Sequence, residues 1–259
     1  MSRRHLLILG GTGEAVALAG AVLARFGESI AVTTALAGRT RHPGPIPGNV
    51  RIGGFGGPDG LAEFIIDDAV DRLIDATHPF AAAISRSARI AAERTGVPRL
   101  VLRRPPWPRH PLDRWIEVDS VEAAATLVGR IGRRAWLTVG TSAVPAFSRA
   151  TATRFLVRLI DPPRAPLPLR QYEVVLGRGP FGVAEELRLL QHHRIDVLVC
   201  KASGGAATEA KLVAARELGL PVIIVRRPPA EPGPAVETVE AALDWLGGLD
   251  RSAPERQIS

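Results

Sequence analysis

The sequence predicts an α/β protein with two parallel-sheet domains. Short apolar runs alternate with amphipathic stretches along both halves of the chain, which is the pattern of a parallel sheet covered by helices. The two halves are separated by the proline-rich segment RRPPWPRHP at 103–111, which can continue neither a helix nor a strand. We therefore predict domains at 1–110 and 111–250, followed by a frayed tail at 251–259.

The apolar runs and helical periods of the first half define eight elements. The expected strands are His5–Leu9, Ile30–Thr34, Val50–Ile52, Arg72–Ala76 and Leu100–Arg103, and the expected helices are Glu14–Phe26, Gly60–Ala69 and Phe80–Thr95. Because each strand is short and apolar and is followed by a longer amphipathic stretch, the strands are expected to run parallel.

The second half repeats this alternation. Strands are expected at Trp115–Val118, Ala135–Val139, Arg154–Ile160, Tyr172–Leu176, Asp196–Cys200 and Pro221–Val225, and helices at Val121–Ile131, Val144–Arg149, Gly182–His193, Ala206–Leu218 and Val236–Leu246. Residues 71–106 also align with 196–229 when a two-residue difference is allowed in the loop after the first strand. A duplication or a shared α/β pattern explains this similarity equally well. In both cases the loops 77–80 and 201–205 lie at the carboxyl ends of parallel strands, where ligands of such sheets bind.

Composition and charge limit the class of protein. A chain of 259 residues with 46% hydrophobic residues buries a sufficient core without disulfides or a structural metal, and its single cysteine, Cys200, favours a reducing cytoplasm. Of 33 basic residues only Lys201 and Lys211 are lysines, so 31 are arginines. The net charge of +7 favours an anionic ligand, whereas the 5% aromatic content and the lack of a recognition motif argue against nucleic acid.

The amino terminus imitates a secretory signal, because Arg3 and Arg4 precede an apolar run. Glu14 and the glycines before it interrupt that run, so a strand, a glycine turn and a helix explain it better. No uninterrupted apolar segment reaches the roughly 18 residues of a membrane span. We expect a soluble cytoplasmic protein without a membrane partner.

The segment Gly10-Gly11-Thr12-Gly13-Glu14 follows the first expected strand and opens a helix, a setting in which a backbone can approach a phosphate. The fingerprint is partial, because Val16 stands where a third glycine is expected. The end of the second strand has no acid for the ribose of NAD but has Thr34, Arg39 and Arg41, which suit the 2′-phosphate of NADP.

The segment Lys201-Ala202-Ser203-Gly204-Gly205 contains one of the two lysines, a hydroxyl and two glycines before a helix, so it is suited to hold an anion. The alternative is a simple strand-to-helix turn with a solvated surface lysine, and it applies more readily to Lys211 than to Lys201. His78 follows a central strand in Thr77-His78-Pro79-Phe80, and Ser85 lies near the start of the next helix. No metal-ligating cluster or hydrolytic triad is found in the sequence.

Four stretches together resemble the precorrin-6A and cobalt-precorrin-6A reductase family of cobalamin biosynthesis. They are Gly10-Gly11-Thr12-x-Glu14, Asp75-Ala76-Thr77-His78-Pro79-Phe80-Ala81, Lys201-x-Ser203-Gly204-Gly205 and 220–228, and the resemblance covers nearly the whole chain. It implies two Rossmann-like domains with NADPH and an anionic tetrapyrrole in the cleft between them, and the reduction of precorrin-6A to precorrin-6B at one macrocycle double bond. Neighbouring pathway enzymes are then possible partners.

These observations single out two sets of site residues. The catalytic candidates are His78, Ser85 and Lys201. The candidates for cofactor binding are Gly10, Gly11, Thr12, Gly13, Glu14, Thr34, Arg39, Thr77, Lys201, Ser203, Gly204 and Gly205. The alternative functions are a two-domain transferase that uses a sugar nucleotide, and a nucleotide-sensing or nucleic-acid-binding module.

Overall fold

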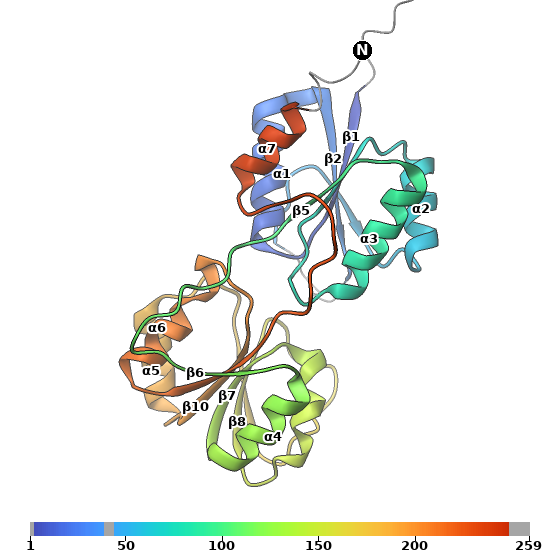
Figure 1. Cartoon of the computed structure of the whole chain (residues 1–259). Coiled ribbons are helices and arrows are strands. Elements are labelled where there is room, and N and C mark those ends of the chain that lie inside the picture. The colour runs from blue at the N-terminus through green and yellow to red at the C-terminus, as the bar shows by residue number, and fades with distance from the viewer. Residues whose placement is uncertain (1–2, 39–43, 249–259) are drawn as a thin grey trace, which may run out of the picture. The chain divides into compact units, whose positions relative to one another are not determined.

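The computed structural model describes residues 3–38 and 44–248. The chain forms two units, each built on its own six-stranded parallel sheet (Figure 1). One unit extends to Arg104 and resumes at Pro228, and the other is Pro105–Arg227. The predicted α/β class with two Rossmann-like parallel sheets is confirmed. No helix in the described part of the chain has the length and apolar character to span a bilayer.

The sheet of the first unit has the order β12-β5-β4-β1-β2-β3. Its strands are β1 (Arg4–Leu9), β2 (Ile30–Leu36), β3 (Asn49–Ile52), β4 (Arg72–Asp75), β5 (Arg99–Leu102) and β12 (Ala235–Val236). All of its strand pairs are parallel. Because chain order reverses between β1 and β4, the loops after these two strands lie at the point where such sheets bind ligands.

Helices cover both faces of this sheet. α1 (Gly13–Phe26) and α7 (Val239–Gly248) lie on one face, and α2 (Pro58–Asp67) and α3 (Ala82–Thr95) on the other, while η1 (Gly27–Ser29) is a short 3-10 turn (Figure 1). Leu6 and Ile8 of β1 pack with α1 and α7, and Leu7 and Leu9 pack with α2 and α3. Successive strand residues point to opposite faces, so a continuous apolar run is what a two-sided core requires.

The sheet of the second unit has the order β6-β11-β10-β7-β8-β9. Its strands are β6 (Arg114–Val118), β7 (Arg134–Thr138), β8 (Arg154–Leu159), β9 (Tyr172–Leu176), β10 (Val197–Lys201) and β11 (Pro221–Val225). The pairs are again parallel. Here chain order reverses between β7 and β10, which therefore correspond to β1 and β4 of the first unit.

The helices of the second unit also lie on two faces. α5 (Val183–His192) and α6 (Ala210–Glu217) pack on one face, and α4 (Val121–Ile131) lies on the other with the 3-10 helix η2 (Thr141–Arg149) (Figure 1). A further 3-10 turn, η3 (Ala206–Thr208), precedes α6. Trp136, Leu198 and Leu212 belong to the core beneath α5 and α6, and all are at most 1% exposed. The single helix predicted over 206–218 consists of two elements in the structure, the 3-10 turn η3 and the helix α6.

The edge strands explain why the two units differ from the predicted ranges 1–110 and 111–250. β6 follows β5 in the chain but pairs with β11, and β12 follows β11 but pairs with β5. α7 then packs on α1, so the segment after Pro228 belongs with the first unit. The two-residue β12 gives no sequence signal, and only its pairing with β5 reveals it. The tail predicted at 251–259 lies outside the described residues.

Candidate functional site

The glycine turn after β1 is shaped by close packing on β2. The Gly10 N–H donates to the Ala35 carbonyl oxygen at 2.9 Å. A Cβ atom on Gly10 would lie 2.8 Å from Cγ2 of Thr34, a residue with no exposed surface. Thr34 thus lies beneath the turn as a packing partner, and in this structure its hydroxyl is closed off from solvent.

We expect Gly10→Ala to lower the free energy of unfolding by about 1–3 kcal/mol, because the added methyl group meets Thr34 inside a packed core. Thr34→Ser removes the opposing Cγ2 atom, so the double variant Gly10→Ala/Thr34→Ser should regain most of the loss. Urea unfolding of the two single variants and the double variant measures this coupling. If the losses of stability in the two single variants simply add in the double variant, the contact between Gly10 and Thr34 would be contradicted.

The rest of the turn presents backbone to solvent at the start of α1. Gly11 has φ +102°, and a Cβ atom on it would meet nothing within 4 Å among the described atoms. Thr12 caps the helix by accepting from the Ala15 N–H at 3.1 Å, and its hydroxyl donates to the Ala76 carbonyl oxygen at 2.7 Å. An open glycine at a helix amino terminus leaves room for a phosphate group, so the turn fits the pyrophosphate of a dinucleotide.

Glu14 lies in the first turn of α1 and faces an arginine. Its Oε1 is 3.5 Å from Nη1 of Arg104, whose side chain is only 10% exposed. Burial lowers the pKa of Arg104, and the charge of Glu14 opposes that shift. The pair places a buried positive charge beside the carboxylate, which offsets the repulsion between Glu14 and a nearby anion.

The loop after β4 joins this turn through the bond between Thr12 and Ala76. Asp75 Oδ1 accepts from the N–H and from the hydroxyl of Thr77, at 3.1 and 2.7 Å. The Thr77 hydroxyl is also 3.3 Å from the Ser85 hydroxyl. His78 Nδ1 accepts from the Phe80 N–H at 3.2 Å, so a neutral His78 carries its hydrogen on Nε2. The structure thus brings Thr77 and Ser85 together at the carboxyl edge of the sheet.

In the second unit, the loop after β10 is fixed by Arg227. The guanidinium donates to the carbonyl oxygens of Ala202 (2.7 Å), Ser203 (2.9 Å) and Pro105 (3.2 Å). A Cβ atom on Gly204 would lie 2.1 Å from both Arg227 and Pro105. The sequence suggested that Gly204 lets a phosphate approach, but it is buried and its own packing already requires glycine.

Lys211 is buried in the second unit. The sequence left a solvated surface lysine open as an alternative, yet Lys211 is 9% exposed. Its ammonium donates to the Thr208 carbonyl oxygen and lies 5.0 Å from the centre of the Trp107 ring. Hydrogen bonding and a cation–π contact stabilise the buried charge. The periodicity of a short helix that begins after a 3-10 turn did not indicate which face Lys211 occupies.

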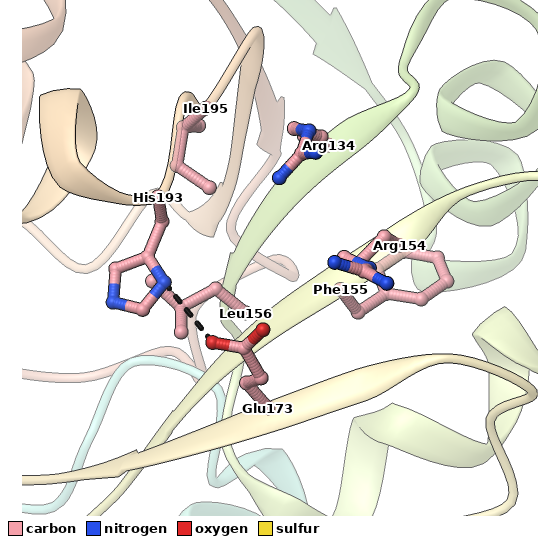
Figure 2. A pocket seen from close by; sticks show the side chains of 7 residues that line it. All are labelled: Arg134, Arg154, Phe155, Leu156, Glu173, His193 and Ile195. Carbon is pink, nitrogen blue, oxygen red and sulfur yellow. Dashed lines mark ion pairs between the residues drawn. The ribbon is translucent and has the colours of Figure 1, made fainter.

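A small cavity lies at the amino-terminal edge of the second sheet, opposite the edge at which Lys201 ends β10. Arg134, Arg154, Glu173 and His193 surround it, and the His193 ring is paired with Glu173 at 3.1 Å (Figure 2). Its volume of about 20 Å³ is enough for only about one water molecule. None of the predicted site residues lines it, so it is not a candidate for the cofactor or the substrate.

Comparison with known proteins decides the family. The family model described as "Precorrin-6x reductase CbiJ/CobK" matches residues 5–247. The chain belongs to the precorrin-6x reductase family. The "Precorrin-6A reductase" of Rhodococcus erythropolis is 50% identical over 248 residues, covering 95% of this chain and 99% of the relative. That of a Sinorhizobium species is 47% identical, with 95% of each chain covered. The solved structure "CobK precorrin-6A reductase" has a TM-score of 0.90 at 40% identity and covers 98% of this chain and 100% of its own.

The resemblance predicted from the four motifs is therefore confirmed, and the chain is a reductase of this family. The family match removes the basis for the alternatives of a sugar-nucleotide transferase and a nucleotide-sensing or nucleic-acid-binding module. The predicted Arg39 lies outside the described residues. The predicted Thr77, in the loop after β4, lies 3.3 Å from the predicted Ser85, in the first turn of α3, and Lys201 ends β10 at the equivalent edge of the second sheet.

Two groups near the candidate site were not indicated by the sequence. Arg104 could not be distinguished among 31 arginines. Gly140, Thr141 and Ser142 follow β7 and are exposed, with φ +82° at Gly140 and nothing within 4 Å of its Cβ position among the described atoms. Because β7 corresponds to β1, the segment Gly140-Thr141 repeats the Gly11-Thr12 signal, and comparing the two sheets would have found it.

Proposed function

We propose that this chain reduces one macrocycle double bond of precorrin-6A with NADPH, giving precorrin-6B in cobalamin biosynthesis. The observation that carries the proposal is the family match over residues 5–247, together with relatives named precorrin-6A reductase at 47–50% identity. The product gains two hydrogens, one as a hydride and one as a proton. His78, Ser85 and Lys201 stay predictions as catalytic candidates.

The turn after β1 is the proposed phosphate site. Gly11 leaves an open space at the amino terminus of α1, and Gly13 has nothing within 4 Å of its Cβ position among the described atoms. When bound, NADPH supplies the hydride. The chain's own contribution is to hold the dinucleotide at a fixed place beside the β4 loop, because alignment of the reacting atoms is the main demand that hydride transfer makes on the protein.

The carboxyl edge of the second sheet is the proposed site for a second anionic group. A charge and three hydroxyls lie at this edge. They come from Lys201 at the end of β10, Ser203 in the loop after it, and Thr141 and Ser142 at the start of η2, which follows the neighbouring strand β7. Such groups suit a phosphate of the cofactor, as predicted for Lys201–Gly205, and equally a carboxylate of the tetrapyrrole. The net charge of +7 further favours a polycarboxylate substrate.

We expect NADPH to be preferred over NADH by about tenfold or more in kcat/KM, corresponding to about 1.4 kcal/mol. The reason is the absence of an acidic residue from the end of the second strand, where Arg39 and Arg41 follow instead. Steady-state kinetics with both nucleotides measures the ratio. Equal values of kcat/KM would contradict the preference.

The experiment that tests the function is anaerobic incubation of the protein with precorrin-6A and NADPH while the absorbance of both is followed. Oxidation of one NADPH per macrocycle reduced is expected. Parallel incubations with cobalt-precorrin-6A show which form of the substrate is used. Failure to oxidise NADPH with either tetrapyrrole would refute the proposed reaction.

A further inference from the structure

Asp75 is a buried carboxylate that the candidate site does not yet use. It ends β4, is 1% exposed, and lies next to the end of β1 in the sheet. Its Oδ1 accepts two hydrogen bonds from Thr77, whereas its Oδ2 is buried without a hydrogen-bond partner in the described part of the chain. The charge of the buried Arg99 offsets part of the cost of burying this carboxylate, but Oδ2 still has no hydrogen bond among the described residues, so the arrangement needs an explanation beyond the stability of one loop.

The hydrogen bonds around Asp75 fix the direction of the next contacts. A hydroxyl has one hydrogen, and Thr77 donates it to Asp75 Oδ1 at 2.7 Å. The Thr77 oxygen can then only accept, so the Ser85 hydroxyl is the donor across the 3.3 Å contact between them. Since Ser85 has donated its only hydrogen, its oxygen presents lone pairs alone to a ligand.

This chain of hydrogen bonds adjoins the proposed phosphate turn. Ala76, between Asp75 and Thr77, accepts the hydroxyl hydrogen of Thr12, the residue that caps α1. Thr77 and Ser85 are both half-buried rather than enclosed. A ligand bound at the start of α1 would therefore lie near the Ser85 oxygen, which can only accept hydrogen bonds because its hydrogen is donated to Thr77.

We propose that Asp75 is a positioning residue which, through Thr77, makes Ser85 a hydrogen-bond acceptor for a donor group of the bound cofactor. The inference rests on the proposed use of NADPH. The donor is an N–H of the nicotinamide carboxamide or an O–H of a ribose, because only these parts of the dinucleotide offer neutral donors near the reacting ring. The same lone pairs disfavour a substrate carboxylate at Ser85, since a carboxylate can only accept.

Binding of NADP⁺ to matched variants tests the proposal by calorimetry. Ser85→Ala and Thr77→Val should each weaken NADP⁺ binding by about tenfold. Thr77→Ser keeps the hydroxyl and should bind as the unchanged protein does, whereas Asp75→Ala removes the acceptor that orients the Thr77 hydroxyl and should weaken NADP⁺ binding by about tenfold as well. Ser87→Ala is the control, because Ser87 lies on the same helix and donates only to the Ala83 carbonyl oxygen at 3.0 Å.

The 3-acetylpyridine analogue of NADP⁺ distinguishes the two donors, because it lacks the amide N–H. If the carboxamide is the donor, the unchanged protein should bind the analogue more weakly than NADP⁺, and Ser85→Ala should remove that difference. If a ribose hydroxyl is the donor, Ser85→Ala should weaken both nucleotides equally while Thr77→Ser weakens neither.

Two results would overturn the proposal. One is that Ser85→Ala and Thr77→Val bind NADP⁺ with the same affinity as the control Ser87→Ala. The other is a loss in Thr77→Ser as large as in Thr77→Val, which would show that loop structure and not the hydroxyl matters. Failure of the unchanged protein to bind NADP⁺ would instead refute the proposed function, and the positioning role with it.

Discussion

Arg158→Ala is expected to lower the free energy of unfolding by about 3–5 kcal/mol, the largest effect on stability predicted for this chain. Arg158 donates to Glu186 Oε1 at 2.5 Å, and the two side chains are 9% and 1% exposed. Its guanidinium also lies 4.6 Å from the centre of the Trp136 ring and 3.9 Å from that of Phe181. Alanine removes these contacts and leaves the Glu186 carboxylate buried without its partner.

Arg154→Ala is the matched control, because Arg154 lies on the same strand but is exposed. It should change stability by no more than about 0.5 kcal/mol. Burial raises the pKa of Glu186 while the hydrogen bond from Arg158 opposes that shift, so an apolar pair of similar size is an acceptable substitute. Arg158→Met/Glu186→Leu should therefore be more stable than Arg158→Ala in urea unfolding. An equal loss from Arg154→Ala and Arg158→Ala would show that the pair contributes nothing.

Gly11→Ala is expected to weaken NADPH binding by about a hundredfold, or about 2.7 kcal/mol. Among the described residues, nothing lies within 4 Å of the Cβ position of Gly11 at the start of α1, where we propose the phosphate binds, and the residue has φ +102°. The methyl group would displace the phosphate from the backbone N–H groups and would also strain the turn. Fluorescence titration with NADPH measures the loss.

Gly96→Ala separates strain from the loss of the phosphate site. Gly96 also has a positive φ, +71°, and nothing lies within 4 Å of its Cβ position in the described residues. It follows α3 at the end remote from the proposed site. Both variants should lose about 1 kcal/mol of stability, because alanine disfavours positive φ. Normal NADPH binding by Gly11→Ala would mean that the turn is structural only.

The elements of the fold could be predicted because their signals are local. The run Leu6–Leu9 is apolar at every position and indicates a strand buried on both faces, which the packing of β1 confirms. The glycines after it, and the cap Thr12, define the start of α1 in the same way. These features depend on neighbours in sequence, so the residues alone determine them.

The candidate site was predictable only where it follows this local pattern. The ends of β1, β4 and β10 could be located from the strands, and with them Gly11, Thr77 and Lys201. The partners that fix those loops come from far along the chain. Arg227 holds Ser203 from 24 residues away, and Arg104 reaches Glu14 from the far end of β5. Arg227 belongs to the recognised segment 220–228, but in a chain with 31 arginines no local signal shows which distant groups Arg104 and Arg227 contact.

The class, the order along the chain of every element except β12, the glycine turn and the family could be inferred from the residues alone. Four features became visible only in the folded chain: β12 completes the first sheet, Lys211 is buried, Gly204 packs against Arg227, and Arg158 pairs with Glu186. The physical reason is the range of the interactions. Backbone propensity and apolar periodicity act over a few residues, whereas strand exchange and the burial of charge depend on contacts between distant segments that form only when the sheet is assembled.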